Sequence, residues 1–217
     1  MHKSINNLIS IETELKSKCE NNNKIKIIAV SKTFSKEDIL PLINHGHINF
    51  GENKIQEAAD KWYNIKRDFV DIKLHMIGKL QSNKVKFAIP LFDYIHSLDN
   101  QKLAEKISSE QKKLNKNLKI FIQINIGGEN QKNGINPKDL QSFYEMCTKK
   151  LNLDIIGLMC IPPNDKRSSL YFSEMKNLKS IIGVNELSMG MSNDYLEAID
   201  NDASYIRIGS KIFGSRF

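Results

Sequence analysis

The stretch "KIKIIAVSKTFSKEDILPLINHGHINFG" (residues 24–51) has the pattern of a strand, a helix and a second strand in succession. An apolar, β-branched run covers 24–31, apolar residues at helical spacing cover 35–45, and a short β-type run covers 47–51. Strands that alternate with helices predict β-α-β units, in which the two strands run parallel.

The same alternation continues along the chain. Further β-type runs lie at 71–78, 92–98, 118–126, 153–161, 185–190 and 204–210. Helical patterns lie at 53–67, 81–88, 99–114, 137–150, 166–181, 192–200 and about 210–216. Eight such units predict an α/β fold, a single closed (β/α)8 barrel of the TIM type over residues 1–217. An open doubly wound sheet is the alternative, but no Gly-rich fingerprint follows the first strand.

An extra helix is expected before the first strand. The first nineteen residues have the pattern of an amphipathic helix, with Ile5, Leu8, Ile9, Glu12 and Leu15 at helical spacing. A chain of 217 residues is short for this class of barrel, for which about 250 are typical. We therefore expect little beyond the barrel and this helix.

The composition argues against several classes of protein. The net charge is +7, but 28 of the 32 basic residues are lysines spread among acidic residues, which favours a solvated surface over a nucleic-acid footprint. No apolar run approaches the roughly 20 residues of a membrane span, and the N-terminus has no apolar signal core. Cys19, Cys147 and Cys160 show neither metal nor disulfide spacing. We expect a cytoplasmic protein that binds neither nucleic acid, nor a membrane, nor a metal ion.

Lys32 ends the apolar run of the first predicted strand. In a barrel of this class, the active site lies at the C-terminal ends of the strands. One interpretation is that the strand simply reaches water at Lys32. The other is that the amine is held at the barrel mouth, where it can form a Schiff base with a carbonyl group.

Residues near the last two predicted strands suit an anion. Ser192 stands where a helix is expected to begin, and Gly209 and Ser210 precede a short helical turn. Each position has a plainer interpretation, as a helix cap or an easy turn. Together, after strands seven and eight, they favour a phosphate site. A phosphate site beside Lys32 suits pyridoxal 5′-phosphate, whose phosphate anchors it while its aldehyde meets the amine.

Several motifs resemble a known family. The chain contains, in order, "AVSKT" (29–33), "FGEN" (50–53), "HMIGKLQSNK" (75–84), "LSMGMS" (187–192) and "RIGSKIFG" (207–214). These motifs, in this order, resemble those of the pyridoxal phosphate homeostasis proteins, which are small relatives of the alanine racemase N-terminal barrel. The resemblance covers nearly the whole chain.

The resemblance implies roles for individual residues. It implies that Lys32 holds pyridoxal 5′-phosphate as an aldimine, that Ser192, Gly209 and Ser210 hold the phosphate, and that Arg207 lies near the pyridine nitrogen. Asn53 is expected either to contact the cofactor or only to cap the helix that follows. His75 is expected either inside the barrel or at its rim. Lys79 departs from the family, which carries a histidine there.

The resemblance also bears on activity. Alanine racemase uses two bases, the cofactor lysine and a tyrosine from a separate C-terminal domain. This sequence ends at "IFGSRF", where the barrel is expected to end, so we expect the second base to be missing. We therefore expect a carrier in pyridoxal phosphate homeostasis and supply, with no catalytic residues. Its expected partners are pyridoxal phosphate-dependent apo-enzymes, and its expected state is a monomer. A weak amino-acid racemase is the alternative.

Overall fold

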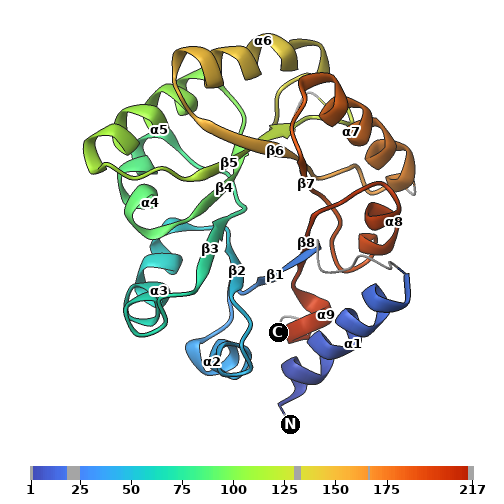
Figure 1. The fold of residues 1–217 in the computed structure, drawn as a ribbon. Helices are drawn as coiled ribbons and strands as arrows, with labels where there is room; N and C mark the ends of the chain where they lie inside the picture. The colour runs from blue at the N-terminus through green and yellow to red at the C-terminus, as the bar shows by residue number, and fades with distance from the viewer. Residues whose placement is uncertain (1, 19–24, 130–132, 166, 215–217) are drawn as a thin grey trace.

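The computed structural model describes residues 2–18, 25–129, 133–165 and 167–214. Within them, parallel strands close into a barrel in the order β1 to β8, with β8 paired to β1 (Figure 1). The strands are β1 (Lys26–Val30), β2 (Asn49–Glu52), β3 (Lys73–Met76), β4 (Tyr94–Leu98), β5 (Lys119–Ile124), β6 (Asp154–Cys160), β7 (Glu186–Ser188) and β8 (Tyr205–Ile208). The predicted barrel is confirmed. The parts of our predictions that fall on residues 1, 19–24, 130–132, 166 and 215–217 lie outside the described residues.

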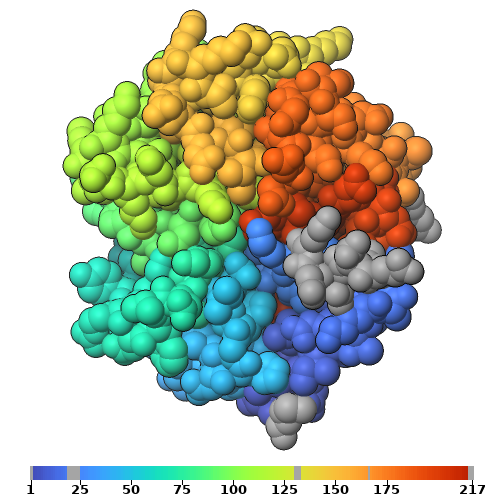
Figure 2. All heavy atoms as spheres, in the orientation of Figure 1, coloured from blue at the N-terminus to red at the C-terminus, as the bar shows by residue number. Residues whose placement is uncertain are grey.

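Helices form the outer layer. They are α1 (Lys3–Lys18), α2 (Lys36–Asn44), α3 (Ile55–Asp68), α4 (Val85–Leu91), α5 (Gln101–Leu114), α6 (Leu140–Glu145), α7 (Ser168–Ile182), α8 (Tyr195–Asp200) and α9 (Ser210–Phe213). Short turns of other helix types adjoin α4 and α6, namely η2 (Ser82–Lys84), η3 (Pro137–Asp139) and η4 (Met146–Lys150). In the space-filling view, the segments from α3 to α7 pack side by side around the ring (Figure 2).

Two of the helices that begin later than the sequence predicts, α8 and α3, bear on the predicted site. Helix α8 begins at Tyr195, and residues before it form a turn, because the Asp194 carboxylate accepts a hydrogen bond from the Met191 amide at 2.6 Å. Ser192 therefore does not cap α8, and that interpretation was wrong. Helix α3 begins at Ile55, with Lys54 as its N-cap, so the interpretation of Asn53 as a helix cap was also wrong.

Apolar side chains form two cores, one inside the barrel and one around it. The inner cluster consists of Ile28, Tyr94, Phe121, Met159 and Tyr205. The larger core lies between the barrel and the helices and includes residues from the opposite faces of the same strands. This division follows from the alternation of side chains across a strand.

The expected N-terminal helix is present as α1 and packs beside α9 (Figure 1). Its buried residues are Ser4, Leu8, Ile11 and Leu15, so Ile11 rather than Ile9 completes the buried face. The Asn7 side-chain amide donates a hydrogen bond to the Ile212 carbonyl oxygen at 2.9 Å. Among the described helices, none has the length and apolar character needed to span a membrane.

Candidate functional site

A cavity of about 830 Å³ opens at the C-terminal ends of the strands. Its wall includes all the residues that the sequence predicts for the cofactor site: Lys32, Asn53, Ser192, Arg207, Gly209 and Ser210. They come from the segments that follow β1, β2 and β7 and from β8 and its end. Parallel strands bring their C-terminal ends to one rim, which explains why residues so far apart in the chain meet here.

A buried polar cluster lies behind Lys32. Glu52 is fully buried, and its Oε1 accepts hydrogen bonds from the Ser31 hydroxyl at 2.8 Å and the Trp62 indole at 2.9 Å. Lys61 Nζ lies 3.0 Å from the same oxygen and also donates to the Ser31 carbonyl oxygen at 2.8 Å. The backbone immediately before Lys32 is therefore fixed by interactions with α3.

The residue after Lys32 adopts an uncommon conformation. Thr33 has φ +70°, in the left-handed region, where a side-chain-bearing residue costs roughly 1–2 kcal/mol. Its amide donates a hydrogen bond to the Glu57 carboxylate, which also contacts Lys61 at 3.2 Å. Strained residues of this kind cluster at functional sites. Lys32 thus lies between a buried ionic cluster and a strained turn that the same cluster supports.

Arg207 is a buried cation in the cavity wall, with 5% of its surface exposed. Nη1 donates to the Ser188 hydroxyl and Nη2 to the Cys160 carbonyl oxygen, each at 2.8 Å. Burial lowers the pKa of this guanidinium, and the nearby Cys160 and Asp194 oppose that effect. An arginine nevertheless stays protonated at neutral pH. Among the described residues, no carboxylate forms a salt bridge with Arg207, and both of its hydrogen-bond acceptors are neutral. Its positive charge is therefore available to a ligand in the cavity.

The two serines meet at the beginning of α9. Ser210 Oγ donates to Ser192 Oγ at 3.1 Å, and the Lys211 amide lies 3.4 Å from the same oxygen. Ser192 therefore belongs with the segment after β8 rather than with α8. At Gly209, a Cβ atom would lie 3.5 Å from Val30 Cβ, an ordinary contact, and φ is −110°. The protein's own packing does not require glycine at this position.

Asn53 reaches the cavity from the segment after β2. Its Oδ1 is buried and has no hydrogen-bond partner among the described residues. Such an atom costs about 1–3 kcal/mol when nothing satisfies it. Its backbone is held tightly against Gly78, where a Cβ atom would lie 2.4 Å from the Asn53 carbonyl oxygen. A rigidly placed amide with unused hydrogen-bonding capacity suits contact with a ligand.

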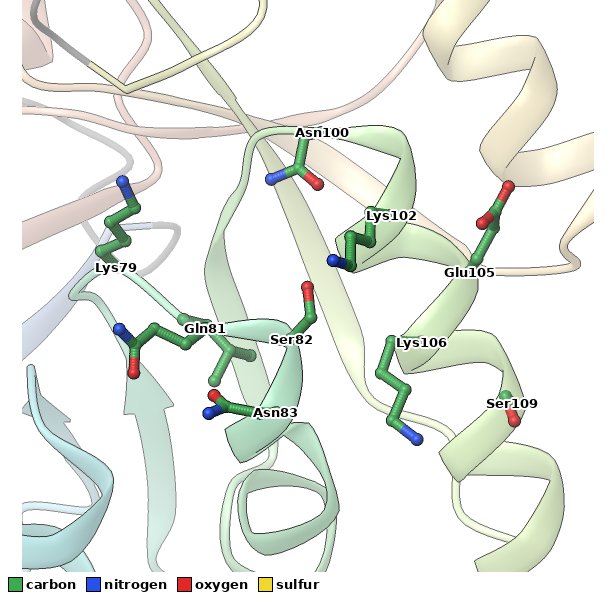
Figure 3. A pocket seen from close by; sticks show the side chains of 10 residues that line it. Lys79, Gln81, Ser82, Asn83, Asn100, Lys102, Glu105, Lys106 and Ser109 are labelled. Atoms are coloured by element: carbon green, nitrogen blue, oxygen red, sulfur yellow. The ribbon is translucent and has the colours of Figure 1, made fainter.

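A second cavity, of about 850 Å³, lies between η2 and α5 (Figure 3). Its wall combines basic, hydroxyl and amide side chains: Lys79, Gln81, Ser82, Asn83, Asn100, Lys102, Lys106 and Ser109, together with Glu105 and Leu80. None of the predicted site residues lines it. Lys79 Nζ donates to Asn133 Oδ1 at 2.7 Å. The departure from the family at Lys79 therefore lies at this cavity and outside the wall of the first.

Sequence reasoning missed the residues that support the cavity from behind. Glu52 lies inside the motif "FGEN", which was the only signal available for it. Lys61 and His96 lie in a helix and a strand without any local signal. His75 faces the barrel interior, where its Nδ1 lies 3.0 Å from His96 Nε2. In the described part of the chain, no group of His, Cys, Asp and Glu could hold a metal ion.

Comparison with known proteins shows which proteins this chain is similar to. Residues 12–216 match the family model of the alanine racemase N-terminal domain. The pyridoxal phosphate homeostasis protein of Aquifex aeolicus is 36% identical over 203 residues, which cover 89% of this chain and 88% of that protein. The structure of PipY from Synechococcus elongatus without PLP superposes with a TM-score of 0.90 at 30% identity, covering 98% of this chain and 100% of that one. The structure of PipY with PLP bound gives 0.83 at 32% identity, covering 93% and 97%. This chain therefore belongs to the pyridoxal phosphate homeostasis protein family, which carries the alanine racemase N-terminal barrel.

Proposed function

We propose that this protein binds pyridoxal 5′-phosphate in the first cavity and serves in the homeostasis and supply of that cofactor inside the cell. The observation that carries the proposal is the convergence of Lys32, Arg207 and the Ser192–Ser210 pair on one cavity. The names of the relatives and the PipY structure with PLP bound support it.

The residues of the cavity fit this cofactor. Arg207 is a buried cation with donors to spare, since its two hydrogen bonds use two of five N–H groups. The buried Oδ1 of Asn53 awaits a partner. The packing of the protein does not require a glycine at position 209, and the missing side chain lets a ligand approach the backbone there. The cavity thus offers a cation, an unused amide and an open backbone beside a lysine.

Each residue would take one role. The Lys32 nitrogen would replace the aldehyde oxygen, which leaves as water, so that a Schiff base joins ligand and protein. Ser192 and Ser210 would donate hydrogen bonds to the phosphate. Arg207 would donate to the pyridine nitrogen and, because it stays charged, would disfavour a proton there. When bound, the cofactor supplies an electron sink, which is weaker with an unprotonated ring.

We propose a carrier rather than an enzyme. Racemisation requires a proton donor and a proton acceptor on opposite faces of the substrate. Among the described residues of the wall, the groups that could transfer protons are Lys32 and Asp194, and Asp194 is engaged by the Met191 amide. Weak racemase activity is the second candidate, which the alanine racemase barrel itself suggests. We further propose one domain over residues 1–217, a monomeric state, a cytoplasmic location, and transfer of the cofactor to apo-enzymes that depend on it.

A binding titration tests the function. Pyridoxal 5′-phosphate is added to the wild type, to Lys32→Ala, and to Lys79→Ala as a control in the second cavity. We expect saturable binding by the wild type and the control, and at least about tenfold weaker binding by Lys32→Ala. Failure of the wild type to bind would contradict the proposal. Interconversion of alanine enantiomers by the wild type, lost in Lys32→Ala, would establish the racemase instead.

A further inference from the structure

A continuous chain of hydrogen bonds crosses the barrel interior from Arg207 to Asn49. Arg207 Nη1 lies 2.8 Å from Ser188 Oγ, which lies 2.9 Å from His96 Nδ1. His96 Nε2 lies 3.0 Å from His75 Nδ1. His75 Nε2 lies 3.1 Å from Asn49 Oδ1. One end of this chain lines the first cavity, and the other lines a small cavity at the N-terminal ends of the strands.

The members of the chain are held rigidly. Ser188, His75 and His96 are fully buried inside the barrel. The His75 ring stacks on Tyr94 with ring centres 4.2 Å apart, and the His96 ring stacks on Phe121 at 4.3 Å. Stacking fixes the orientation of both rings, so their nitrogens stay within hydrogen-bond distance of their partners. What remains to be settled is which atom of each pair carries the hydrogen.

Arg207 removes that freedom. A guanidinium can only donate, so the Ser188 oxygen accepts from Arg207 and the Ser188 hydrogen points to His96 Nδ1. His96 then carries its hydrogen on Nε2 and donates to His75 Nδ1. For the same reason, His75 carries its hydrogen on Nε2 and donates to Asn49 Oδ1. Every bond in this arrangement has one donor and one acceptor.

The opposite direction does not satisfy the groups. If His96 donated to Ser188, the Ser188 hydroxyl hydrogen would need another acceptor, and Ser188 Oγ has no third partner among the described residues. Protonation of both nitrogens of either ring would place two donors in one bond. Burial lowers the pKa of both His75 and His96 well below 6.5, which keeps the rings neutral.

We propose that Ser188, His96 and His75 are positioning residues, which fix the direction in which Arg207 presents its remaining N–H groups to the cavity. A donor that is oriented before the ligand arrives loses little freedom on binding, which strengthens binding. The part of this inference that concerns affinity rests on the proposed pyridoxal 5′-phosphate site. The part that concerns the chain itself does not.

Nitrogen NMR of histidine-labelled protein without ligand tests the chain. We expect His75 and His96 both as the neutral form with hydrogen on Nε2. In Ser188→Ala, His96 Nδ1 loses its hydrogen-bond donor, so we expect the Nδ1 signal of His96 to shift, while the hydrogen on Nε2 stays bonded to His75. Ser97→Ala is the matched control, because the Ser97 hydroxyl is buried in the same strand as His96 and has no partner in the described structure. A His96 with hydrogen on Nδ1 in the wild type, or unchanged His96 signals in Ser188→Ala, would overturn the inference.

A double-mutant cycle tests the effect on Arg207. We expect Ser188→Ala to weaken binding of pyridoxal 5′-phosphate about tenfold in the wild-type background and to have no further effect in Arg207→Gln. An equal loss in both backgrounds, or no loss in either, would show that Ser188 does not act through Arg207. If the wild type binds no pyridoxal 5′-phosphate, the proposed function fails, while the NMR result still decides whether the chain exists as described.

Discussion

The ammonium group of Lys61 lies 3.0 Å from Oε1 of Glu52, and both side chains are buried behind the turn that carries Lys32. Desolvation makes such a pair costly to form, but removal of one partner leaves a buried charge without compensation, at a cost of about 3–5 kcal/mol. The net contribution of the pair to stability is therefore small, but loss of one partner should destabilise the turn that carries Lys32.

Replacement of Lys61 tests this role. We expect Lys61→Met to lower the free energy of unfolding by about 3 kcal/mol. Lys149→Met is the control, since the pair of Lys149 and Glu145 is exposed and 3.5 Å long, and its loss should cost less than about 1 kcal/mol. Urea denaturation measures both. Equal effects of the two substitutions would contradict a buried, structurally important pair.

Gly209 separates folding from binding. A methyl group at this position would make only ordinary contacts with Val30, and φ is negative. We therefore expect the free energy of unfolding of Gly209→Ala to lie within about 0.5 kcal/mol of the wild-type value. If the backbone approaches the phosphate there, the same variant should bind pyridoxal 5′-phosphate about tenfold more weakly. Thermal unfolding without ligand and a binding titration give the two values. Undiminished affinity would show that the ligand does not approach Gly209.

Ser192 should act on the phosphate in particular. Its hydroxyl lies 3.1 Å from that of Ser210, and a hydrogen bond to a charged group contributes about 1.5–3 kcal/mol. We expect Ser192→Ala to weaken binding of pyridoxal 5′-phosphate at least about tenfold while leaving binding of pyridoxal, which lacks the phosphate, nearly unchanged. An equal loss of affinity for both ligands would show that Ser192 does not act through the phosphate.

The buried histidines should make stability depend on pH. Burial lowers the pKa of His75 and His96 well below 6.5 in the folded state, whereas an unfolded histidine titrates near about 6.5. Below that value the unfolded state binds more protons, so the stabilisation is complete above it and is lost as the pH falls. The slope should approach about 1.4 kcal/mol per pH unit for each histidine. Urea unfolding at about pH 7.5 and about pH 5.5 measures it, and equal stability at both would exclude neutral buried rings.

The sequence predicted the barrel because strand and helix periods alternate without interruption, and this local pattern survives in every unit. It misplaced the start of α8 because a side chain decides it: the Asp194 carboxylate binds the Met191 amide and delays the helix to Tyr195. The cavity residues could be found because strand ends and motif positions coincide at one rim.

The supporting residues could not be found in this way. Lys61 lies in an amphipathic helix where a lysine usually faces water, and only the position of Glu52 on a neighbouring strand makes it buried. His75 and His96 lie in different strands, and their 3.0 Å contact depends on how β3 and β4 curve around the barrel. Contacts of this kind depend on tertiary register, which local periodicity does not encode.

The most direct test of the Lys32 assignment is reduction of the protein with borohydride in the presence of pyridoxal 5′-phosphate, followed by peptide mass mapping. Borohydride converts a Schiff base into a stable amine, so the bonded lysine keeps the cofactor. We predict modification at Lys32, loss of the visible absorbance band on reduction, and neither signal in Lys32→Ala. Modification spread over surface lysines, or a wild type that remains colourless with excess pyridoxal 5′-phosphate, would contradict the assignment and leave Lys32 as a strand end that reaches water.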